Sequence, residues 1–207
     1  MIYEIELTTL TYGGEALGRL PDGRAVFVPF VLPGERARVE LVEEKRGYAR
    51  GRLVEVLRTA PTRIAPRCAH FTACGGCHYQ HLSYADQLEA KSSILKDQLE
   101  RIAGVINPPL RPIVPSPGPW YYRNAIQFHL DPQGRLGFLA ADGSGVMAIR
   151  ECHLPEDPLN DLWPRLNFEP LPGLERIALR LDARGEALVT LESSTAEVPA
   201  ISVEELP

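Results

Sequence analysis

Four cysteines, three of them close together, place the strongest constraint on how this chain can fold. Cys68, Cys74 and Cys77 follow the spacing C-x5-C-x2-C, and the fourth, Cys152, lies far beyond them in the sequence. A metal site gains most from a fixed cage when its ligands come from a loop and a second element, because the remote ligand ties the two together. If the four thiols share one site, the fold has to bring residue 152 against the 68–77 loop.

Three kinds of cysteine site are open on spacing alone. A four-thiolate iron–sulfur cluster often takes three ligands from one short run and one from a remote position. A four-cysteine zinc site usually draws on two close pairs, and Cys152 has no partner nearby in the sequence. The thiols can also be unrelated buried side chains. Gly75 and Gly76 favour a site of some kind, because they let the backbone curl around an ion and point N–H groups at sulfur.

The chain lacks the sequence features of a membrane or secreted protein. Its apolar runs are far shorter than the roughly 20 residues that a spanning helix needs. The N-terminal stretch MIYEIELTTL carries acidic residues where a signal peptide has Lys or Arg. We expect a cytoplasmic, monomeric protein with no membrane partner. Thiols stay reduced in that compartment, so metal ligands or catalysts are expected in place of disulfides.

The net charge of −5 hides a segregation of charge along the chain. Residues 45–67 hold seven Lys and Arg against one acid, a local charge of +6, and residues 151–207 hold twelve acids against four Arg, a local charge of −8. Such a basic stretch indicates a polyanion partner, although a solvated charged face is the alternative. The nucleic-acid contacts expected from this stretch are Arg46, Tyr48, Arg50, Arg52, Arg58 and Arg63.

Residues 2–57 have the pattern of short alternating strands separated by turns. The turn signals are Gly13-Gly14, Asp22-Gly23, Pro33-Gly34 and Arg46-Gly47. Asp22-Gly23 is a favoured two-residue hairpin turn. Five strands in so short a segment predict a small closed barrel of the OB kind, whose surface commonly holds single-stranded nucleic acid.

One helix is expected after the cysteine cluster. Ser83 and Asp86 form a capping box, and Gly104 supplies the stop. The apolar face of this helix is expected to be Leu88, Leu95, Leu99 and Ile102. Six prolines between residues 108 and 119 then predict a stiff extended crossing.

Antiparallel hairpins are expected in the rest of the chain. YYRNAIQFHL and RLGFLA flank the turn at residues 131–134, while ERIALRLD and EALVTLE flank the turn at residues 183–185. Cys152 comes directly after an expected strand, Val146 to Ile149. The end of that strand therefore has to meet the cysteine loop if the thiols share a site.

Several stretches together resemble a known enzyme family. CGGCHYQHLSYADQLEAK, WYYRNAIQFHL and GRLGFLAADGSGVMAIRECHL are similar to the N-terminal two-thirds or less of the RNA uracil-5-methyltransferases. Those enzymes begin with a TRAM domain, an OB-like RNA-binding barrel, followed by an iron–sulfur domain and a methyltransferase domain that uses S-adenosylmethionine. The resemblance implies a 4Fe-4S cluster held by Cys68, Cys74, Cys77 and Cys152, and a structured RNA partner, rRNA or tRNA.

The fold class implied by this resemblance is mostly β within the α+β class. We expect an OB-like five-stranded TRAM barrel over residues 1–59. A small α+β iron–sulfur domain with antiparallel hairpins and one long helix is expected over residues 60–207.

No stretch of the sequence resembles the catalytic part of that family. Gly13, Gly14 and Gly18 lie in an expected hairpin and precede no helix, so they are not a cofactor loop. Uracil methylation in the family needs a nucleophilic thiolate, and the implied cluster uses all four thiols. We therefore expect the RNA-binding and iron–sulfur portion of an S-adenosylmethionine-dependent RNA (uracil-5-)-methyltransferase, with the catalytic domain and its S-adenosylmethionine missing, and inactive alone.

Two other functions are considered. The main alternative is a free-standing iron–sulfur module that binds RNA or senses redox state. A radical enzyme is disfavoured, since the cluster of such an enzyme leaves one iron without a protein ligand and Cys152 fills that position.

Five further side chains near the cysteines have open roles. His78 and His153 adjoin implied ligands, and we expect polar or surface roles for them. Phe71 and Tyr79 either stack on RNA bases or shield the cluster from water, with shielding favoured for Tyr79. Arg123 matches the arginine of a family motif, and it either grips a phosphate or fixes the backbone near the cluster.

Overall fold

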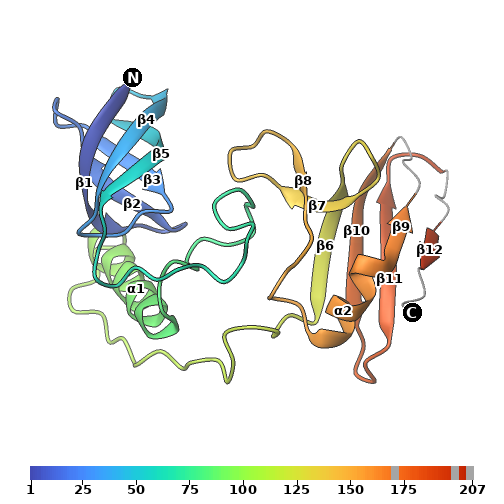
Figure 1. Cartoon of the computed structure of the whole chain (residues 1–207). Coiled ribbons are helices and arrows are strands. Elements are labelled where there is room, and N and C mark those ends of the chain that lie inside the picture. Colours follow the sequence, from blue (N-terminus) through green and yellow to red (C-terminus); the bar gives the residue numbers. More distant parts are fainter. Residues whose placement is uncertain (169–172, 197–200, 204–207) are drawn as a thin grey trace. The chain divides into compact units, whose positions relative to one another are not determined.

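The structure, a computed structural model, describes residues 1–168, 173–196 and 201–203. The fold is mostly β with few helices, as the sequence predicted (Figure 1). Its strands form a closed five-stranded barrel, a five-stranded sheet and a two-stranded sheet. No helix in the described ranges is long and apolar enough to cross a membrane.

The chain divides into two compact units, each made of two stretches of sequence. The barrel unit consists of Met1–Arg67 and His78–Pro115, and the sheet unit of Cys68–Cys77 and Ser116–Pro207. The expected division after residue 59 does not coincide with these units. The long helix packs with the barrel, while the cysteine loop belongs to the other unit.

The barrel confirms the prediction of five strands at the start of the chain. Its strand order is β1-β2-β3-β5-β4, closed by antiparallel pairing of β1 with β4. β3 and β5 pair in parallel, which the hairpin signals did not reveal. The strands are β1 (Ile2–Leu10), β2 (Glu15–Arg19), β3 (Ala25–Pro29), β4 (Arg36–Glu44) and β5 (Tyr48–Arg58).

Apolar and polar residues alternate along the strands, so that the apolar side chains point inward and fill the barrel. Two glycines let the facing strands approach closely. A Cβ at Gly18 would lie 2.3 Å from Cγ2 of Ile5, and one at Gly51 would lie 2.2 Å from Cγ1 of Val39. The buried core consists of Ile5, Leu7, Ala16, Leu20, Val26, Val28, Val31, Ala37, Val39 and Ala49.

The predicted helix is present, but its buried face differs from the expected one. α1 (Tyr84–Asp97) begins at Ser83, whose hydroxyl accepts a hydrogen bond from the Asp86 backbone N–H, and it continues as a π-helical turn, η1 (Gln98–Ile102). Ile94 is the residue that is buried, while Leu95 and Ile102 are 50% and 64% exposed. Leu95 follows Ile94 by one residue, about 100° around the helix, and so lies off the buried face. The change to π-helix at Gln98 then shifts the positions of Leu99 and Ile102 from the expected 3.6-residue period.

A buried ion pair joins the barrel to the segment that follows it. The Glu35 carboxylate is fully buried and accepts hydrogen bonds from the backbone N–H groups of Leu32 and Ala60, at 2.9 and 3.1 Å. It also accepts hydrogen bonds from the Arg63 guanidinium, from Nε at 2.6 Å and from Nη2 at 2.8 Å. Burial alone would raise the pKa of Glu35, but these hydrogen bonds and the Arg63 charge hold it below its ordinary value.

His81 lies fully buried in the same unit and should make this unit sensitive to acid. Burial lowers its pKa from 6.5 to about 4, and the nearby Arg63 charge acts in the same direction. The folded state therefore keeps His81 neutral while the unfolded chain binds a proton below 6.5, so stability falls as the pH drops from 6.5 towards 4.

We expect the free energy of unfolding of the barrel unit to be lower at about pH 5 than at about pH 7, by on the order of 2 kcal/mol. Urea unfolding followed by the circular dichroism of α1 measures this difference. The depressed pKa of Glu35 makes no contribution here, because its stabilisation is lost only below 4.5. A His81→Gln variant should lose the difference, and retention of the full difference in that variant would assign it to another group.

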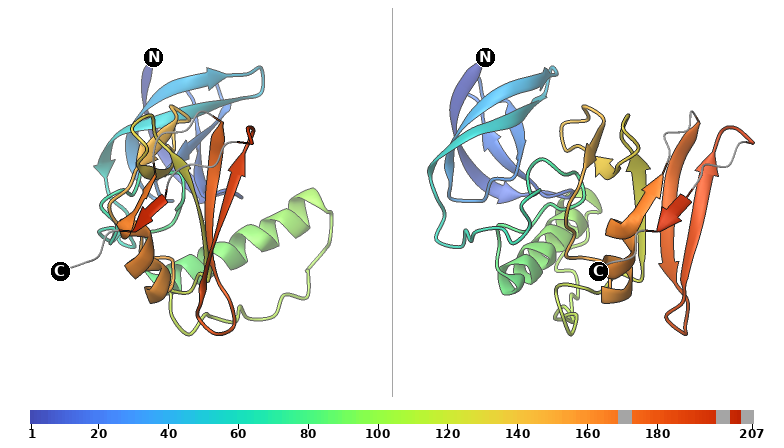
Figure 2. Two further views of the ribbon diagram at one scale, coloured as in Figure 1. Left: turned by 90° about the vertical axis from the view of Figure 1, so that its right-hand side faces the viewer. Right: turned by 45° about the vertical axis from the view of Figure 1, so that its right-hand side comes forward.

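The sheet unit contains both hairpins that the sequence predicted (Figures 1 and 2). Its strand order is β11-β10-β6-β7-β8, with β6 pairing antiparallel to β10, a strand far from it in the sequence. The strands are β6 (Ala125–Leu130), β7 (Leu136–Leu139), β8 (Val146–Ala148), β10 (Leu174–Leu181) and β11 (Ala187–Ser193).

A short helical segment packs on this sheet and completes its core. α2 (Asp157–Leu162) leads into the turn η2 (Trp163–Arg165) and then into β9 (Leu166–Phe168), which pairs with β12 (Ile201–Val203). The Phe128 ring stacks on Phe138 with centroids 5.2 Å apart and contacts Trp163 at 5.4 Å. The proline-rich stretch at residues 108–119 forms neither helix nor strand, in agreement with the extended crossing expected there.

Candidate cysteine site and nucleic-acid surface

All four cysteines belong to the sheet unit, although Cys152 lies far from the other three in the sequence. Each of them is a free thiol and is half-buried. Cys152 follows β8, as the sequence predicted. The fold therefore brings the three clustered cysteines and the remote one into a single compact unit.

Backbone pairing holds the cysteine loop, residues 68–77, against the turn between β7 and β8. The Gly75 N–H donates to the Leu139 carbonyl at 3.0 Å, and the Ala141 N–H donates to the Ala73 carbonyl at 2.8 Å. A Cβ on Gly75 would lie 3.0 Å from that same Leu139 oxygen. Gly75 is thus needed for close approach of two backbones, and its N–H points at a carbonyl oxygen in place of the sulfur expected from the sequence.

Two side chains fasten this loop to the residues before Cys152. The Glu151 carboxylate accepts a hydrogen bond from the Ala69 N–H at 2.7 Å, and His70 Nε2 accepts one from the Arg150 N–H at 3.0 Å. The bond from Ala69 is the main reason why the pKa of Glu151 lies below its ordinary value. Sequence reasoning missed both residues, and only their positions beside Cys68 and Cys152 could have indicated them.

Backbone N–H groups point at two of the sulfur atoms. The His70 N–H donates to Cys68 Sγ at 3.4 Å, and the Gly76 N–H donates to Cys74 Sγ at 3.3 Å. Hydrogen bonds of this kind favour a thiolate and are typical of sulfur atoms that ligate metal. The expected role of Gly76, to aim an N–H at sulfur, agrees with this contact.

The four thiols lie close enough to affect one another's ionisation. Burial raises the pKa of Cys152 to about 11, and negative charge on Cys77, Cys68 and Cys74 adds to the effect. Burial is also the main cause that raises the pKa values of Cys68 and Cys74. With their pKa values raised, Cys68, Cys74 and Cys152 favour the protonated thiol, and a bound cationic group would favour their thiolates.

Within residues 1–168, 173–196 and 201–203, no three His, Cys, Asp or Glu side chains converge on a point that suits one metal ion. The zinc ion of a four-cysteine site lies about 2.3 Å from each sulfur and would require such convergence. In the part of the chain that the structure describes, the four thiols therefore do not form a zinc-type site.

An aromatic segment lies beside the remote cysteine. The Tyr121 N–H donates to the carbonyl of His153, and the Tyr121 hydroxyl lies 3.3 Å from His153 Nδ1. Trp120 and Tyr121 both meet the imidazole edge-on, with ring centroids 6.1 and 6.2 Å away. Polar and ring contacts therefore hold His153 next to Cys152, and the polar role expected for it stays a prediction.

Two residues predicted to contact RNA near the cysteines differ in their surroundings. Phe71 is only 8% exposed, so its ring is covered by protein, and this burial argues against the predicted stacking on a base. Arg123 is exposed, with its guanidinium 5.9 Å from the centroid of the Tyr122 ring. Its backbone pairs with Leu154 and Glu156, so it fixes the chain just after Cys152 while its side chain stays accessible to phosphate.

Most arginines of the basic stretch are paired with acids on neighbouring strands. Arg50 contacts Glu15 at 2.6 Å, Arg58 contacts Glu6 at 2.6 Å, and Arg52 pairs with Glu40. Arg63 is the partner of buried Glu35 and is unavailable to RNA. The local charge of +6 counted along the chain is therefore largely cancelled in space. A phosphate would have to compete with these carboxylates.

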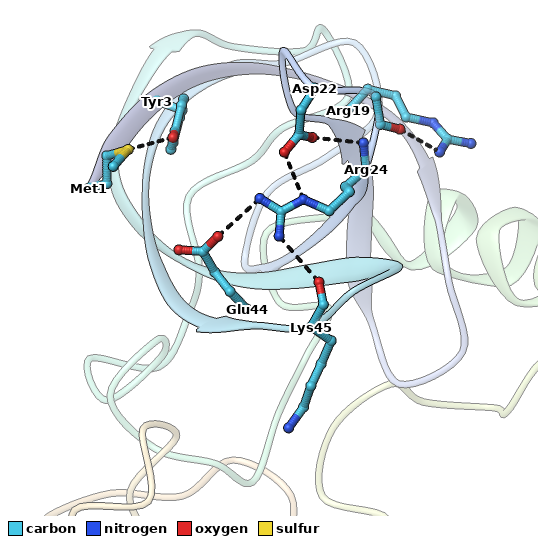
Figure 3. A network of polar contacts seen from close by, with 8 residues as sticks. Met1, Tyr3, Arg19, Asp22, Arg24, Glu44 and Lys45 are labelled. Atoms are coloured by element: carbon cyan, nitrogen blue, oxygen red, sulfur yellow. Dashed lines mark hydrogen bonds and ion pairs between the residues drawn. The ribbon is translucent and has the colours of Figure 1, made fainter.

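The tip of the β4–β5 hairpin carries Arg46 and Tyr48, two predicted contacts of the barrel that remain accessible. Arg24 bridges this hairpin to the β2–β3 turn by bonding Asp22, Glu44 and the Lys45 carbonyl (Figure 3). Tyr48 is 36% exposed and meets Phe27 edge-on at 6.0 Å. Arg46 is exposed and makes no ion pair with any residue that the structure describes.

Comparison with known proteins relates the barrel to RNA-binding enzymes. Residues 2–54 match the TRAM domain family model, which covers β1 to β4 and much of β5. The chain is 35% identical to an uncharacterized RNA methyltransferase of Synechocystis sp., over 96% of this chain and 46% of that protein. It is 38% identical to a 23S rRNA (uracil(1939)-C(5))-methyltransferase of Shewanella sp., over 68% of this chain and 32% of that protein.

A solved structure has a similar fold. The chain superimposes on the tRNA (uracil-54, C5)-methyltransferase of Pyrococcus abyssi, in complex with S-adenosyl-L-homocysteine, with a TM-score of 0.60 and 22% identity. The match covers 93% of this chain and 46% of that one. The chain thus spans about half the length, or less, of the proteins that it matches.

These comparisons correct the expected function. The relatives that match 68–96% of the chain are RNA methyltransferases, so neither an inactive portion nor a free-standing redox-sensing module is supported. The expectation that the chain resembles only an N-terminal portion of this family is not supported either. The chain spans less than half the length of those relatives. The lack of a cofactor loop or spare thiol among its residues is therefore no argument against catalysis by the protein.

Proposed function

We propose that the protein is an S-adenosylmethionine-dependent RNA (uracil-5-)-methyltransferase, in which these residues bind the RNA and hold an iron–sulfur cluster. The observation that carries the proposal is the similarity to RNA methyltransferases over nearly the whole chain. Two further matches, to a 23S rRNA uracil-C5 enzyme and to a tRNA uracil-C5 enzyme, favour a uridine in rRNA or tRNA as the target. Such a substrate would place the protein in the cytoplasm.

The proposed cluster is 4Fe-4S, with Cys68, Cys74, Cys77 and Cys152 as its ligands. The donor set fits, because four reduced thiols lie in one unit and backbone N–H groups point at two of their sulfur atoms. When bound, the cluster supplies iron–thiolate bonds that join the 68–77 loop to the end of β8.

Methyl transfer tests the enzymatic part of this proposal. The protein expressed from its own gene would be incubated with methyl-labelled S-adenosylmethionine and with rRNA and tRNA from cells that lack the gene. We expect label in 5-methyluridine after digestion of the RNA to nucleosides. Label in another nucleoside, or none in RNA, would refute a uracil-5-methyltransferase.

The ion pairs of the barrel predict which arginines contribute to RNA binding. We expect Arg46→Gln to weaken binding of structured RNA several-fold and to lower the slope of log affinity against log salt by about 0.9, the share of one phosphate contact. Arg52→Gln is the matched control, because Arg52 already pairs with Glu40. Titrations at several salt concentrations measure both variants, and equal effects would show that the ion pairs do not decide the contacts.

A further inference from the structure

A pocket of about 690 Å³ lies in the barrel unit, next to the turn between β1 and β2. It is built only from residues of that unit, so its shape belongs to one compact body. Its volume falls within the range of roughly 300 to 1,000 Å³ that small-molecule sites occupy. The lining residues are Tyr12, Gly13, His78, Tyr79, Lys91, Ile94, Leu95 and Gln98.

The glycine turn fixes one wall of this pocket. The Thr11 N–H and hydroxyl both donate to the Glu15 carbonyl, and the Gly14 N–H donates to the Thr11 carbonyl. Gly13 and Gly14 have φ values of +93° and +88°, which favour glycine. A Cβ on Gly14 would lie 2.7 Å from Cβ of His78, so only glycine lets His78 sit against the turn.

Flat rings and an apolar floor give the pocket its chemistry. Tyr12 is 82% exposed at the tip of the turn, and the His78 and Tyr79 rings meet edge-on with centroids 6.5 Å apart. Ile94 and Leu95 of α1 supply the floor. An exposed tyrosine beside such a floor offers a face on which a planar aromatic group can stack.

Two polar side chains at the pocket complement a nucleotide. Lys91 lies on α1 and makes no ion pair within the described part of the chain, in contrast to Arg50, Arg52 and Arg58. Its ammonium group is therefore available to a phosphate without displacing a carboxylate. Gln98 offers an amide that can donate to and accept from the polar edge of a base.

We infer that this pocket binds one unstacked nucleobase of the RNA substrate, with Tyr12 stacking on the base and Lys91 facing its phosphate. The inference rests on the proposed RNA-binding function and adds to it a subsite that the basic stretch did not indicate. Bases of single-stranded or splayed-out RNA are recognised in this way, by aromatic stacking with a nearby cation.

The test uses a short single-stranded oligoribonucleotide that carries 2-aminopurine, whose fluorescence falls when the base stacks on an aromatic ring. We expect quenching by the unmodified chain and by Tyr12→Phe, which keeps the ring. Tyr12→Ala should bind about 5- to 160-fold more weakly and lose the quenching, since stacking contributes roughly 1–3 kcal/mol per base. Lys91→Gln should lower the slope of log affinity against log salt by about 0.7, which is the contribution of one phosphate contact to a single strand.

Binding of structured RNA by the same variants separates the two proposals. If structured RNA binds and Tyr12→Ala leaves oligonucleotide affinity and quenching unchanged, the pocket is refuted and RNA binding stands. If the unmodified chain binds neither RNA, RNA binding by these residues and the subsite are both refuted. Tyr12 is mostly exposed, so thermal unfolding of Tyr12→Ala should match that of the unmodified chain; a large drop would assign Tyr12 to packing and overturn the inference.

Discussion

Replacing Glu35 by glutamine is expected to lower the free energy of unfolding of the barrel unit by about 3 to 5 kcal/mol. The carboxylate is fully buried and accepts four hydrogen bonds, two from backbone and two from Arg63. Glutamine keeps one oxygen acceptor but leaves the Arg63 charge without its counter-ion in a largely buried site. Removal of one member of a buried pair is costly for that reason.

An exposed ion pair of the same barrel provides the control. Arg58 and Glu6 contact at 2.6 Å, but their side chains are 61% and 65% exposed. Arg58→Gln should therefore change stability by less than about 1 kcal/mol. Urea unfolding followed by circular dichroism compares the two variants, with Arg63→Lys as a milder second probe if Glu35→Gln does not fold. Equal, small losses for both pairs would show that Glu35 is not what joins the barrel to the segment after it.

Replacing Cys152 by serine is expected to remove most of the iron from the purified protein. Cys152 is the remote ligand of the proposed cluster, and the 68–77 loop otherwise rests on a few backbone and side-chain hydrogen bonds. Loss of the cluster should open this loop to proteases, because its bonds to Leu139, Ala141 and Glu151 lie near the surface. Iron analysis and limited proteolysis with mass spectrometry measure the two effects.

The matched control for this variant is Ala141→Ser. It introduces a serine into the turn that the loop contacts, but it leaves all four thiols and the backbone bond to Ala73 in place. We expect normal iron content and normal protease resistance in this control. Full iron content in Cys152→Ser would exclude Cys152 as a ligand.

Local signals carried the correct predictions of the fold. Ser83 with Asp86 marked the start of α1, and period-two patterns marked the strands. Asp22-Gly23 marked the position of a turn, but the loop has three residues, 21–23, closed by the Leu20 N–H on the Arg24 carbonyl, in place of the predicted two. Each of these signals depends on residues that are neighbours in the sequence, where steric preference and capping act directly. The pairing of β6 with β10 and the parallel pairing of β3 with β5 had no such signal, because they join distant segments whose hydrogen bonds do not depend on side-chain identity.

The basic stretch shows why the candidate RNA surface was harder to predict. Charge counted along the chain gave an excess of arginine, but strand register places Glu40 opposite Arg52 and Glu43 opposite Arg50. Cross-strand partners of this kind become visible only when the register is known. The cysteines were different, since a thiol pattern restricts the fold by its own chemistry. The residues just before Cys152 contact the cysteine loop, as expected, while the shared site of the four thiols stays a prediction.

Iron and acid-labile sulfide in the chain purified without oxygen test the assignment of the four thiols most directly. The assignment predicts about four iron and about four sulfide per chain, with a brown colour from the cluster. About one zinc per chain and no sulfide would contradict it, and would mean that the thiols converge on a single ion once metal is bound.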